Sequence, residues 1–273
     1  MKKDGIILWQ GKSLIDNQRI VCIATGLSIK SANTKTGSMI QTWIIRRDID
    51  PMLARRLGED KSVCGNCKHR EQSTCYVNLC HGPINIFKAF HDGKYSHFQT
   101  EDIELFKNRS LRIGSYGDPA AVPFEIWNYL SPHVKNFNGY THQWKTCDQR
   151  LKHFCMASVD SIKGYYNEYG EAKKRGWRTF RIRTADDDKI MEDEFICPAS
   201  KEGGQKTVCE KCGACGGLSS TSRKNPVIIL HGDGIADWRL KRYTALMKKI
   251  KNKKKWRRDY KAQKKEFNRV CWF

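Results

Sequence analysis

The chain has 273 residues, twelve of them cysteine, and a formal net charge of +21. This length allows one sizeable core, and no stretch approaches the roughly 20 apolar residues of a membrane-spanning helix. The charge predicts a polyanionic partner, with nucleic acid the first candidate. The N-terminus carries no secretory signal pattern, so we expect a soluble cytoplasmic protein, in which clustered cysteines indicate metal or redox chemistry rather than disulfides.

Residues 1–60 are expected to form a β-rich N-terminal extension. Asp50 and Pro51 predict the N-cap and first turn of a short helix that ends near Gly58. The polar loop at 33–37 is too short and too poor in glycine to be a phosphate-binding loop. The strand candidates are 6–9, 20–23 and 39–45.

The first cysteine group follows that helix. It reads Cys64-x2-Cys67-x7-Cys75-x4-Cys80. The first two cysteines form a typical metal half-site, and the other two complete four sulfur ligands. The spacing predicts a metal site, which could be a structural zinc site.

Residues 61–234 are expected to form a metal-binding α/β domain, because helical patterns alternate with short apolar strands that end in polar residues. This alternation predicts a parallel sheet in a (β/α) barrel or partial barrel, with functional side chains at the carboxyl ends of the strands. An open doubly wound sheet would place them at the same ends. Helices are expected at 119–130 and 161–174, with Gly176 as the C-terminal cap. The strand candidates are 111–114, 134–140, 155–159, 179–182, 195–196 and 227–230.

The second cysteine group lies within this domain. Cys209, Cys212 and Cys215 have the spacing Cys-x2-Cys-x2-Cys, and Cys197, next to a proline, supplies a fourth sulfur. Four sulfurs suit a [4Fe–4S] cluster. The alternative is Zn²⁺ held by the last three cysteines and His231.

Polar residues at the strand ends are candidates for chemistry. Asp118 and Asp160 are candidate catalytic carboxylates, although each could instead cap a helix. His142 is a candidate for base recognition or a hydrogen-bonded structural residue. Arg183 shares a strand face with Arg181, which suits binding of a phosphate or of a cofactor carboxylate, with ion pairing to nearby acids as the alternative.

Residues 235–273 are expected to form a basic amphipathic helix or arm. The functional interpretation is a segment that follows nucleic-acid phosphates, and the alternative is a solvated helix docked by its aromatic side chains. The predicted nucleic-acid contacts are Lys248, Lys249, Lys251, Lys253, Lys254, Lys255, Trp256, Arg257 and Arg258.

Three motifs resemble those of radical S-adenosylmethionine enzymes. Tyr76 directly follows Cys75, as an aromatic residue does in that family's cluster loop. The segment 114–119 resembles the Gly-Gly-Glu-Pro motif, with aspartate in place of glutamate, and 158–160 resembles the Ser-x-Asp motif. The resemblance implies a [4Fe–4S] cluster on Cys64, Cys67 and Cys75, an auxiliary cluster on the second cysteine group, and an S-adenosylmethionine pocket near Gly117, Asp118, Ser158 and Asp160. Arg183 is a further candidate for cofactor binding, on the strand pattern given above.

Two other resemblances point elsewhere. The combination of motifs is similar to that of uncharacterised phage proteins of the gene-product-88 type. It includes Cys-Pro-Ala-Ser and Cys-x2-Cys-x2-Cys before His-Gly. This similarity implies a phage-encoded protein in a bacterial host cytoplasm. The chain also resembles guanine transglycosylases of the queuosine and archaeosine type. For these, Asp118 and Asp160 would be base and nucleophile, and Cys209, Cys212, Cys215 and His231 would bind zinc.

The favoured expectation is an iron–sulfur enzyme that modifies a nucleic acid or nucleotide base. The first alternative is a zinc-dependent transglycosylase that acts on DNA or RNA. The second is a non-catalytic, zinc-containing nucleic-acid-binding protein. No membrane partner is expected.

Overall fold

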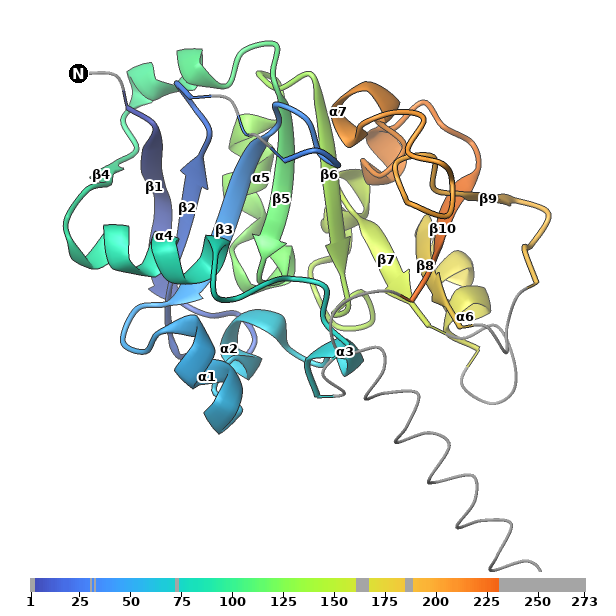
Figure 1. The fold of residues 1–273 in the computed structure, drawn as a ribbon, viewed down its shortest axis with the longest axis horizontal. Coiled ribbons are helices and arrows are strands. Elements are labelled where there is room, and N and C mark those ends of the chain that lie inside the picture. The colour runs from blue at the N-terminus through green and yellow to red at the C-terminus, as the bar shows by residue number, and fades with distance from the viewer. Residues whose placement is uncertain are drawn as a thin grey trace, which may run out of the picture.

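The computed structural model describes residues 3–29, 31, 33–71, 74–160, 167–184 and 189–230. These residues form an α/β fold around one ten-stranded sheet, with strand order β4-β1-β2-β3-β5-β6-β7-β8-β10-β9 (Figure 1). The predicted basic arm at 235–273 and His231 lie outside the described residues. Within the described residues, no helix is long and apolar enough to cross a membrane.

The N-terminal strands form an antiparallel meander, as the three apolar segments predict. They are β1 (Gly5–Lys12), β2 (Arg19–Thr25) and β3 (Ile40–Arg46). The run from Ile20 to Ala24 is fully buried, because β2 lies between two other strands and is covered on both faces.

The remaining strands continue the same sheet in parallel. Strand β3 pairs in parallel with β5, so the β-rich segment within 1–60 and the later strands share one sheet. Parallel pairing extends from β5 to β9 through each neighbour in the strand order. These strands are β5 (Ser110–Tyr116), β6 (Asn136–Thr141), β7 (Met156–Val159), β8 (Thr179–Arg183), β9 (Glu194–Ile196) and β10 (Asn225–Ile229).

Within the described residues the sheet does not close into a barrel. Its two edges there are β9 and β4 (Ser96–His97), and β4 pairs with β1. The prediction of an α/β fold with parallel strands is therefore confirmed, while the barrel is replaced by an open sheet. The antiparallel strands β1–β3 extend one edge of the parallel sheet.

Capping residues in the sequence define the boundaries of the first helix. Helix α1 (Pro51–Leu57) begins where the Asp50 carboxylate accepts hydrogen bonds from the backbone N–H groups of Met52 and Leu53, and it ends at Gly58 in the left-handed conformation. The other α-helices are α2 (Lys61–Cys64), α3 (Lys68–Glu71), α4 (Gly82–His91), α5 (Phe124–Leu130), α6 (Glu168–Lys174) and α7 (Cys209–Cys212). The 3₁₀ helices are η1 (Thr100–Leu105), η2 (Pro119–Ala121), η3 (Gln149–His153) and η4 (Gly217–Ser219).

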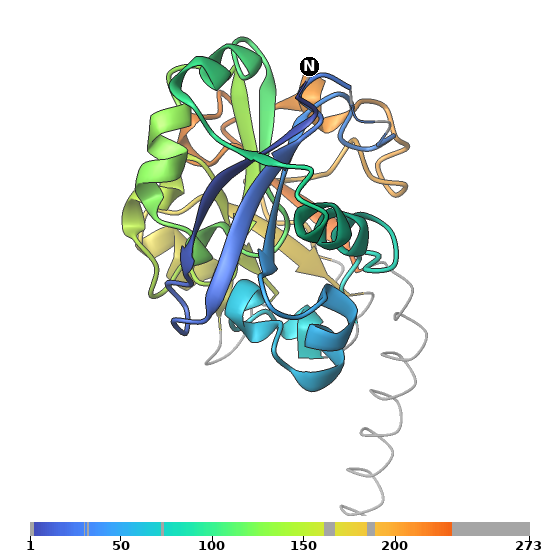
Figure 2. The ribbon, with the colours of Figure 1, turned by 90° about the vertical axis from the view of Figure 1, so that its left-hand side faces the viewer.

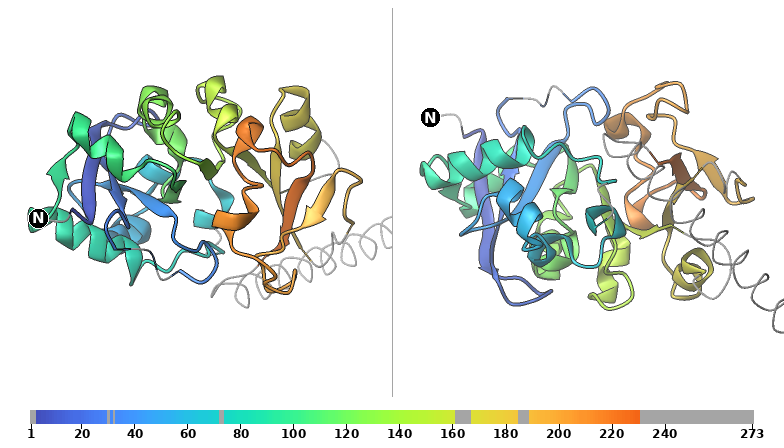
Figure 3. Two further views of the ribbon diagram at one scale, coloured as in Figure 1. Left: turned by 90° about the horizontal axis from the view of Figure 1, so that it is seen from above. Right: turned by 60° about the horizontal axis from the view of Figure 1, so that its bottom comes forward.

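Helices cover both faces of the sheet. Helix α4 lies across one face, over the N-terminal strands, whereas α5 and α6 lie on the opposite face (Figures 1 and 2). The loops around α7 lie on the same side as α4 (Figure 3). The space between β6–β10 and these loops is where the candidate site is found.

Two buried tryptophans fix the segments that follow the strands. The indole N–H of Trp127 donates to the carbonyl oxygen of Pro119 at 3.1 Å, and that of Trp144 donates to the carbonyl oxygen of Ser158 at 3.2 Å. Both side chains have less than 2 % relative exposure, so each ring is packed in the core while its one polar atom is satisfied. The ends of β5, β6 and β7 are thereby held in place.

Candidate functional site

The first cysteine group is folded around a buried ion pair. The carboxylate of Asp60 accepts from Arg70 at 2.9 Å and lies 3.7 Å from the guanidinium of Arg55. Between these charges the chain turns sharply at Gly65, where φ is +55° and an added Cβ would collide with the side chain of Gln143. Cys64 ends α2 and Cys67 begins the next turn, so the two thiols lie on one compact loop.

Three of the four cysteines in this group lie close together. Burial raises the pKa of the Cys64 thiol, and the charges of Cys67 and Cys75 raise it further. Cys80 lies apart from them: its side chain is exposed, and its sulfur contacts the sulfur of Met52 at 3.8 Å. The arrangement therefore brings together Cys64, Cys67 and Cys75 and leaves Cys80 at the surface.

The second cysteine group is brought together completely. Cys197 follows β9, Cys209 and Cys212 lie at the two ends of α7, and Cys215 follows that helix. All four line one small cavity of about 10 Å³, together with the buried side chain of Asn138 on β6. The tertiary fold thus unites Cys197 with three cysteines that follow it by twelve or more positions in the sequence.

The loop at 33–37 has a role that its sequence did not reveal. The carbonyl oxygens of Lys35 and Thr36 accept from the backbone N–H groups of Cys209 and Glu210 at 2.9 and 3.2 Å. The Glu210 carboxylate in turn accepts from the backbone and hydroxyl of Ser38. The loop docks the first turn of α7 onto the sheet and so positions the second cysteine group.

The sulfur atoms in both groups are spread more widely than the ligands of a single metal ion. Among the described residues, the only set of three or more His, Cys, Asp or Glu ligand atoms within 4.8 Å of one another is His69, His142 and Asp160. The sulfurs around one tetrahedral zinc ion would lie about 3.8 Å apart, given Zn–S bonds of about 2.3 Å. A cubic cluster separates its thiolates further, because each one binds a different iron.

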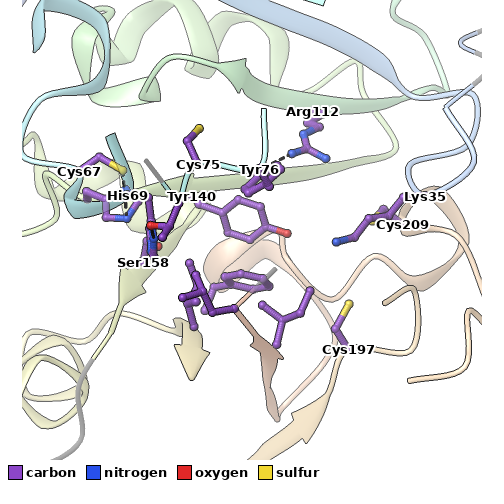
Figure 4. Close-up of a pocket in the computed structure, with 16 residues that line it drawn as sticks. Lys35, Cys67, His69, Cys75, Tyr76, Arg112, Tyr140, Ser158, Cys197 and Cys209 are labelled. Carbon is purple, nitrogen blue, oxygen red and sulfur yellow. Dashed lines mark hydrogen bonds between the residues drawn. The ribbon is translucent and has the colours of Figure 1, made fainter. Parts of the chain in front are cut away.

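The two cysteine groups face one cavity of about 100 Å³. Cys67 and Cys75 line one side, and Cys197 and Cys209 line the other, next to Lys35 (Figure 4). Tyr140, Ser158, Ile182 and Ile228 lie in the carboxyl-terminal parts of their strands, whereas Arg112 and Phe180 lie in the amino-terminal halves of β5 and β8. The remaining lining residues are His69, Thr74, Tyr76, His142 and Leu230.

Arg112 introduces a buried positive charge into this cavity. Its guanidinium donates to the Tyr76 hydroxyl at 2.9 Å, and within the part of the chain that the structure describes it forms no ion pair with a carboxylate. Burial lowers the pKa of Arg112, whereas the charges of Tyr76, Tyr140, Cys209 and Cys215 raise it, with a net rise. The groups that can offset this cation are therefore phenol and thiol groups, of which the cysteines belong to the second group.

Asp118 serves as an anchor between three segments. Its two carboxylate oxygens accept from the backbone N–H groups of Ala120 at 3.0 Å and His142 at 2.8 Å, and its own N–H donates to the carbonyl oxygen of Val63. Burial raises the pKa of this carboxyl. Asp118 is not among the residues that line the cavity. The helix-capping alternative is thus the geometry observed, extended by two tertiary contacts.

Gly117 is required by packing. Its φ is +85°, and an added Cβ would lie 2.6 Å from the Cβ and 2.7 Å from the carbonyl oxygen of Ile44 on β3. A side chain at this position would therefore push Asp118 away from its backbone partners. This steric requirement explains the glycine without a cofactor contact.

His142 and Asp160 lie next to a histidine that sequence reasoning missed. The Nε2 atom of His69 lies 3.2 Å from Oδ1 of Asp160, and the rings of His69 and His142 meet edge to face with centroids 5.9 Å apart. Burial raises the pKa of Asp160, but the hydrogen bond from His69 and the nearby positive charges of His69, His142 and Lys68 lower it overall. The only sequence signal for His69 is its place two residues after Cys67.

The strand arginines form ion pairs. Arg181 and Glu194 are fully buried and paired at 2.7 Å, and Arg183 pairs with Glu202. Neither arginine lines the cavity. Ser158, by contrast, lies in the cavity wall as predicted for a residue at the end of β7.

Comparisons of this chain with protein-family models, with curated proteins and with solved structures find no match.

Proposed function

We propose that this protein is an iron–sulfur enzyme of the radical S-adenosylmethionine type that modifies a nucleic acid or a nucleotide base. The observation that carries this proposal is the shared cavity: Cys67 and Cys75 line one side of it, and Cys197 and Cys209 line the other. Two metal sites that face one interior space suit a reaction at one centre with a second centre nearby. We also propose that the parallel strands act as a partial barrel, because the cavity lies near their carboxyl ends.

The donor sets support clusters over single zinc ions. Each group offers at least three thiols, and within the described residues no three of these sulfurs lie within 4.8 Å of one another. The sulfurs around one tetrahedral zinc ion would lie about 3.8 Å apart, so neither group is arranged as the ligand set of a single zinc ion. Cys64, Cys67 and Cys75 would hold the first cluster, which leaves one iron without a protein ligand. Cys197, Cys209, Cys212 and Cys215 would hold the second.

The buried charge of Arg112 also supports a metal at the second group. A guanidinium that is 8 % exposed and has no carboxylate partner within the described chain is costly unless another anion lies nearby. Neutral thiols would not offset it. Metal-bound thiolates would, because such a site carries net negative charge.

The residues around the cavity define what the site can do. When bound, a [4Fe–4S] cluster at the first group would supply the electron that cleaves S-adenosylmethionine reductively. Tyr140 and Phe180 supply aromatic walls against which a planar base can pack. Lys35 and Arg112 place positive charge in the cavity wall, where it can bind anionic groups of a substrate or cofactor.

The net charge of +21 supports a nucleic-acid substrate. Binding through phosphates should weaken steeply with salt, because each neutralised phosphate releases counterions. Titration of a labelled oligonucleotide at increasing salt would test this part. An affinity that does not change with salt would refute it.

The decisive experiment is anaerobic purification followed by iron, sulfide and zinc analysis and an assay with S-adenosylmethionine and dithionite. We expect about four irons and four sulfides per cluster, and cleavage to methionine and 5′-deoxyadenosine. Cys64→Ser should lose the first cluster and the cleavage, Cys209→Ser should lose the second cluster only, and the exposed control Cys80→Ser should retain both. About two zinc ions without sulfide, or no cleavage by fully loaded protein, would overturn the proposal.

The zinc-dependent transglycosylase is less well supported than the iron–sulfur enzyme. That mechanism needs two carboxylates free to act on the substrate, whereas both oxygens of Asp118 accept backbone hydrogen bonds. Retained oligonucleotide binding without cleavage or colour would instead identify the non-catalytic binding protein.

A further inference from the structure

A compact group of three possible metal donors without a cysteine lies beside the first cysteine group. Its donors are His69, His142 and Asp160, and the three ligand atoms lie within 4.8 Å of one another. We propose that these residues bind one divalent transition-metal ion, such as Zn²⁺, with its remaining coordination positions facing the cavity. This inference goes beyond the proposed iron–sulfur function, because neither cysteine group supplies its ligands.

The donors converge because of the order of the parallel strands. His142 follows β6 and Asp160 follows β7, and these two strands are neighbours in the sheet. The loop of the first cysteine group places His69 next to the carboxyl ends of β6 and β7. Two imidazoles and one carboxylate are a donor set that binds zinc and non-haem iron with positions left open for water or substrate. Both imidazoles line the cavity, so an open position would face it.

The existing contacts already approach coordination geometry. Nε2 of His69 lies 3.2 Å from Oδ1 of Asp160, close to the separation of about 3.4 Å expected for two ligands at bonds of about 2.0–2.2 Å in a tetrahedral site. The side chains are partly buried, with 13 % and 18 % relative exposure, so they are not an exposed acidic patch. A metal ion would replace the direct contact between them.

The His69 ring has a partner outside the metal position, and the backbones of His142 and Asp160 are held by carboxylates. Nδ1 of His69 lies 2.9 Å from the hydroxyl oxygen of Thr74. This oxygen would accept a hydrogen bond from the Nδ1–H group when Nε2 binds a metal. The backbone N–H of His142 donates to Asp118, and that of Asp160 donates to Glu168. Metal-binding histidines typically donate a hydrogen bond from the second ring nitrogen, as His69 would to Thr74, and this bond fixes the tautomer and the ring orientation.

Cys67 marks the boundary with the first cysteine group. Its sulfur lies 3.7 Å from Nε2 of His142. It is not part of the donor set, in which every ligand atom lies within 4.8 Å of every other. We therefore assign Cys67 to the cysteine group, and the coordination of the new site is free of sulfur. This assignment gives the two sites different spectra, since thiolate ligands produce intense charge-transfer absorption and nitrogen and oxygen ligands do not.

The test is a Co²⁺ titration of the full-length protein with its cysteine sites loaded, followed by visible absorption. We expect one equivalent of cobalt with weak d–d bands only. His69→Ala and Asp160→Asn should weaken binding by about 100-fold or more, and Thr74→Val, which removes only the outer partner, by about 10-fold. The exposed residue His97 provides the matched control His97→Ala, which should bind as the original protein does.

Three results would overturn the inference. The first is full cobalt binding in both His69→Ala and Asp160→Asn with unchanged circular dichroism. The second is an unaltered affinity in Thr74→Val, which keeps the three ligands and tests the site if the ligand variants do not fold. The third is a thiolate charge-transfer band that disappears in Cys67→Ala. Absence of iron and sulfide would refute the proposed function and leave this cobalt site in place, so the two failures are distinguishable.

Discussion

Replacement of Gly117 by alanine should destabilise the protein more than a typical glycine substitution. The backbone there is left-handed, with φ of +85°, which costs an L-residue roughly 1–2 kcal/mol. The new Cβ would also lie 2.6 Å from Cβ and 2.7 Å from the carbonyl oxygen of Ile44. Because part of this obstacle is backbone in a central strand, it cannot rotate away, and overpacking adds about 1–3 kcal/mol. Together these effects predict a loss of about 2–5 kcal/mol in the free energy of unfolding.

Gly58 provides the matched control. Its φ is +79°, but an added Cβ would meet no atom within 4 Å. Gly58→Ala should therefore cost only the conformational part, roughly 1–2 kcal/mol, and both substitutions reduce the entropy of the unfolded chain equally. Denaturant unfolding of the two variants beside the unaltered protein isolates the contact with Ile44. Equal losses in the two variants would refute the steric account of Gly117.

Three further predictions concern buried and paired charges. Glu194→Gln should cost about 3–5 kcal/mol in denaturant unfolding, because it removes one negative partner of the buried Arg181 guanidinium, whereas Lys107→Ala in an exposed pair should cost under about 1 kcal/mol; similar losses would contradict this. Asp118→Asn should cost about 1–3 kcal/mol by the same measurement, since its NH₂ group cannot accept the second backbone N–H; unchanged stability would argue against the anchor. Burial raises the pKa of Asp193, but hydrogen bonds from Lys173 and Tyr169 lower it overall. Its ionised form therefore stabilises the fold above the unfolded pKa of about 3.9, and this contribution is lost as pH falls through the lower folded pKa. Melting temperatures should accordingly fall less on acidification in Asp193→Asn than in the unaltered protein, and parallel curves would contradict the assignment.

Much of the local structure follows from the sequence. The apolar runs became strands in their predicted places, and Asp50 and Gly58 delimit α1 as capping residues do. The expected helix at 119–130 is divided into η2 and α5, because Pro123 interrupts the pattern. These features depend on residues a few positions apart, so the sequence contains their causes.

The candidate site depended on contacts between distant segments. The spacing of the cysteines predicted two groups, but only the parallel order of β5 to β10 places both groups against one cavity. The same order joins His69 to His142 and Asp160 and sets the loop at 33–37 under Cys209. The pairing of β3 with β5, which makes the antiparallel strands part of the same open sheet, was likewise decided by the tertiary structure. Periodicity and spacing describe neighbours along the chain, whereas these contacts join residues tens to more than a hundred positions apart, and only the packing of the sheet determines them.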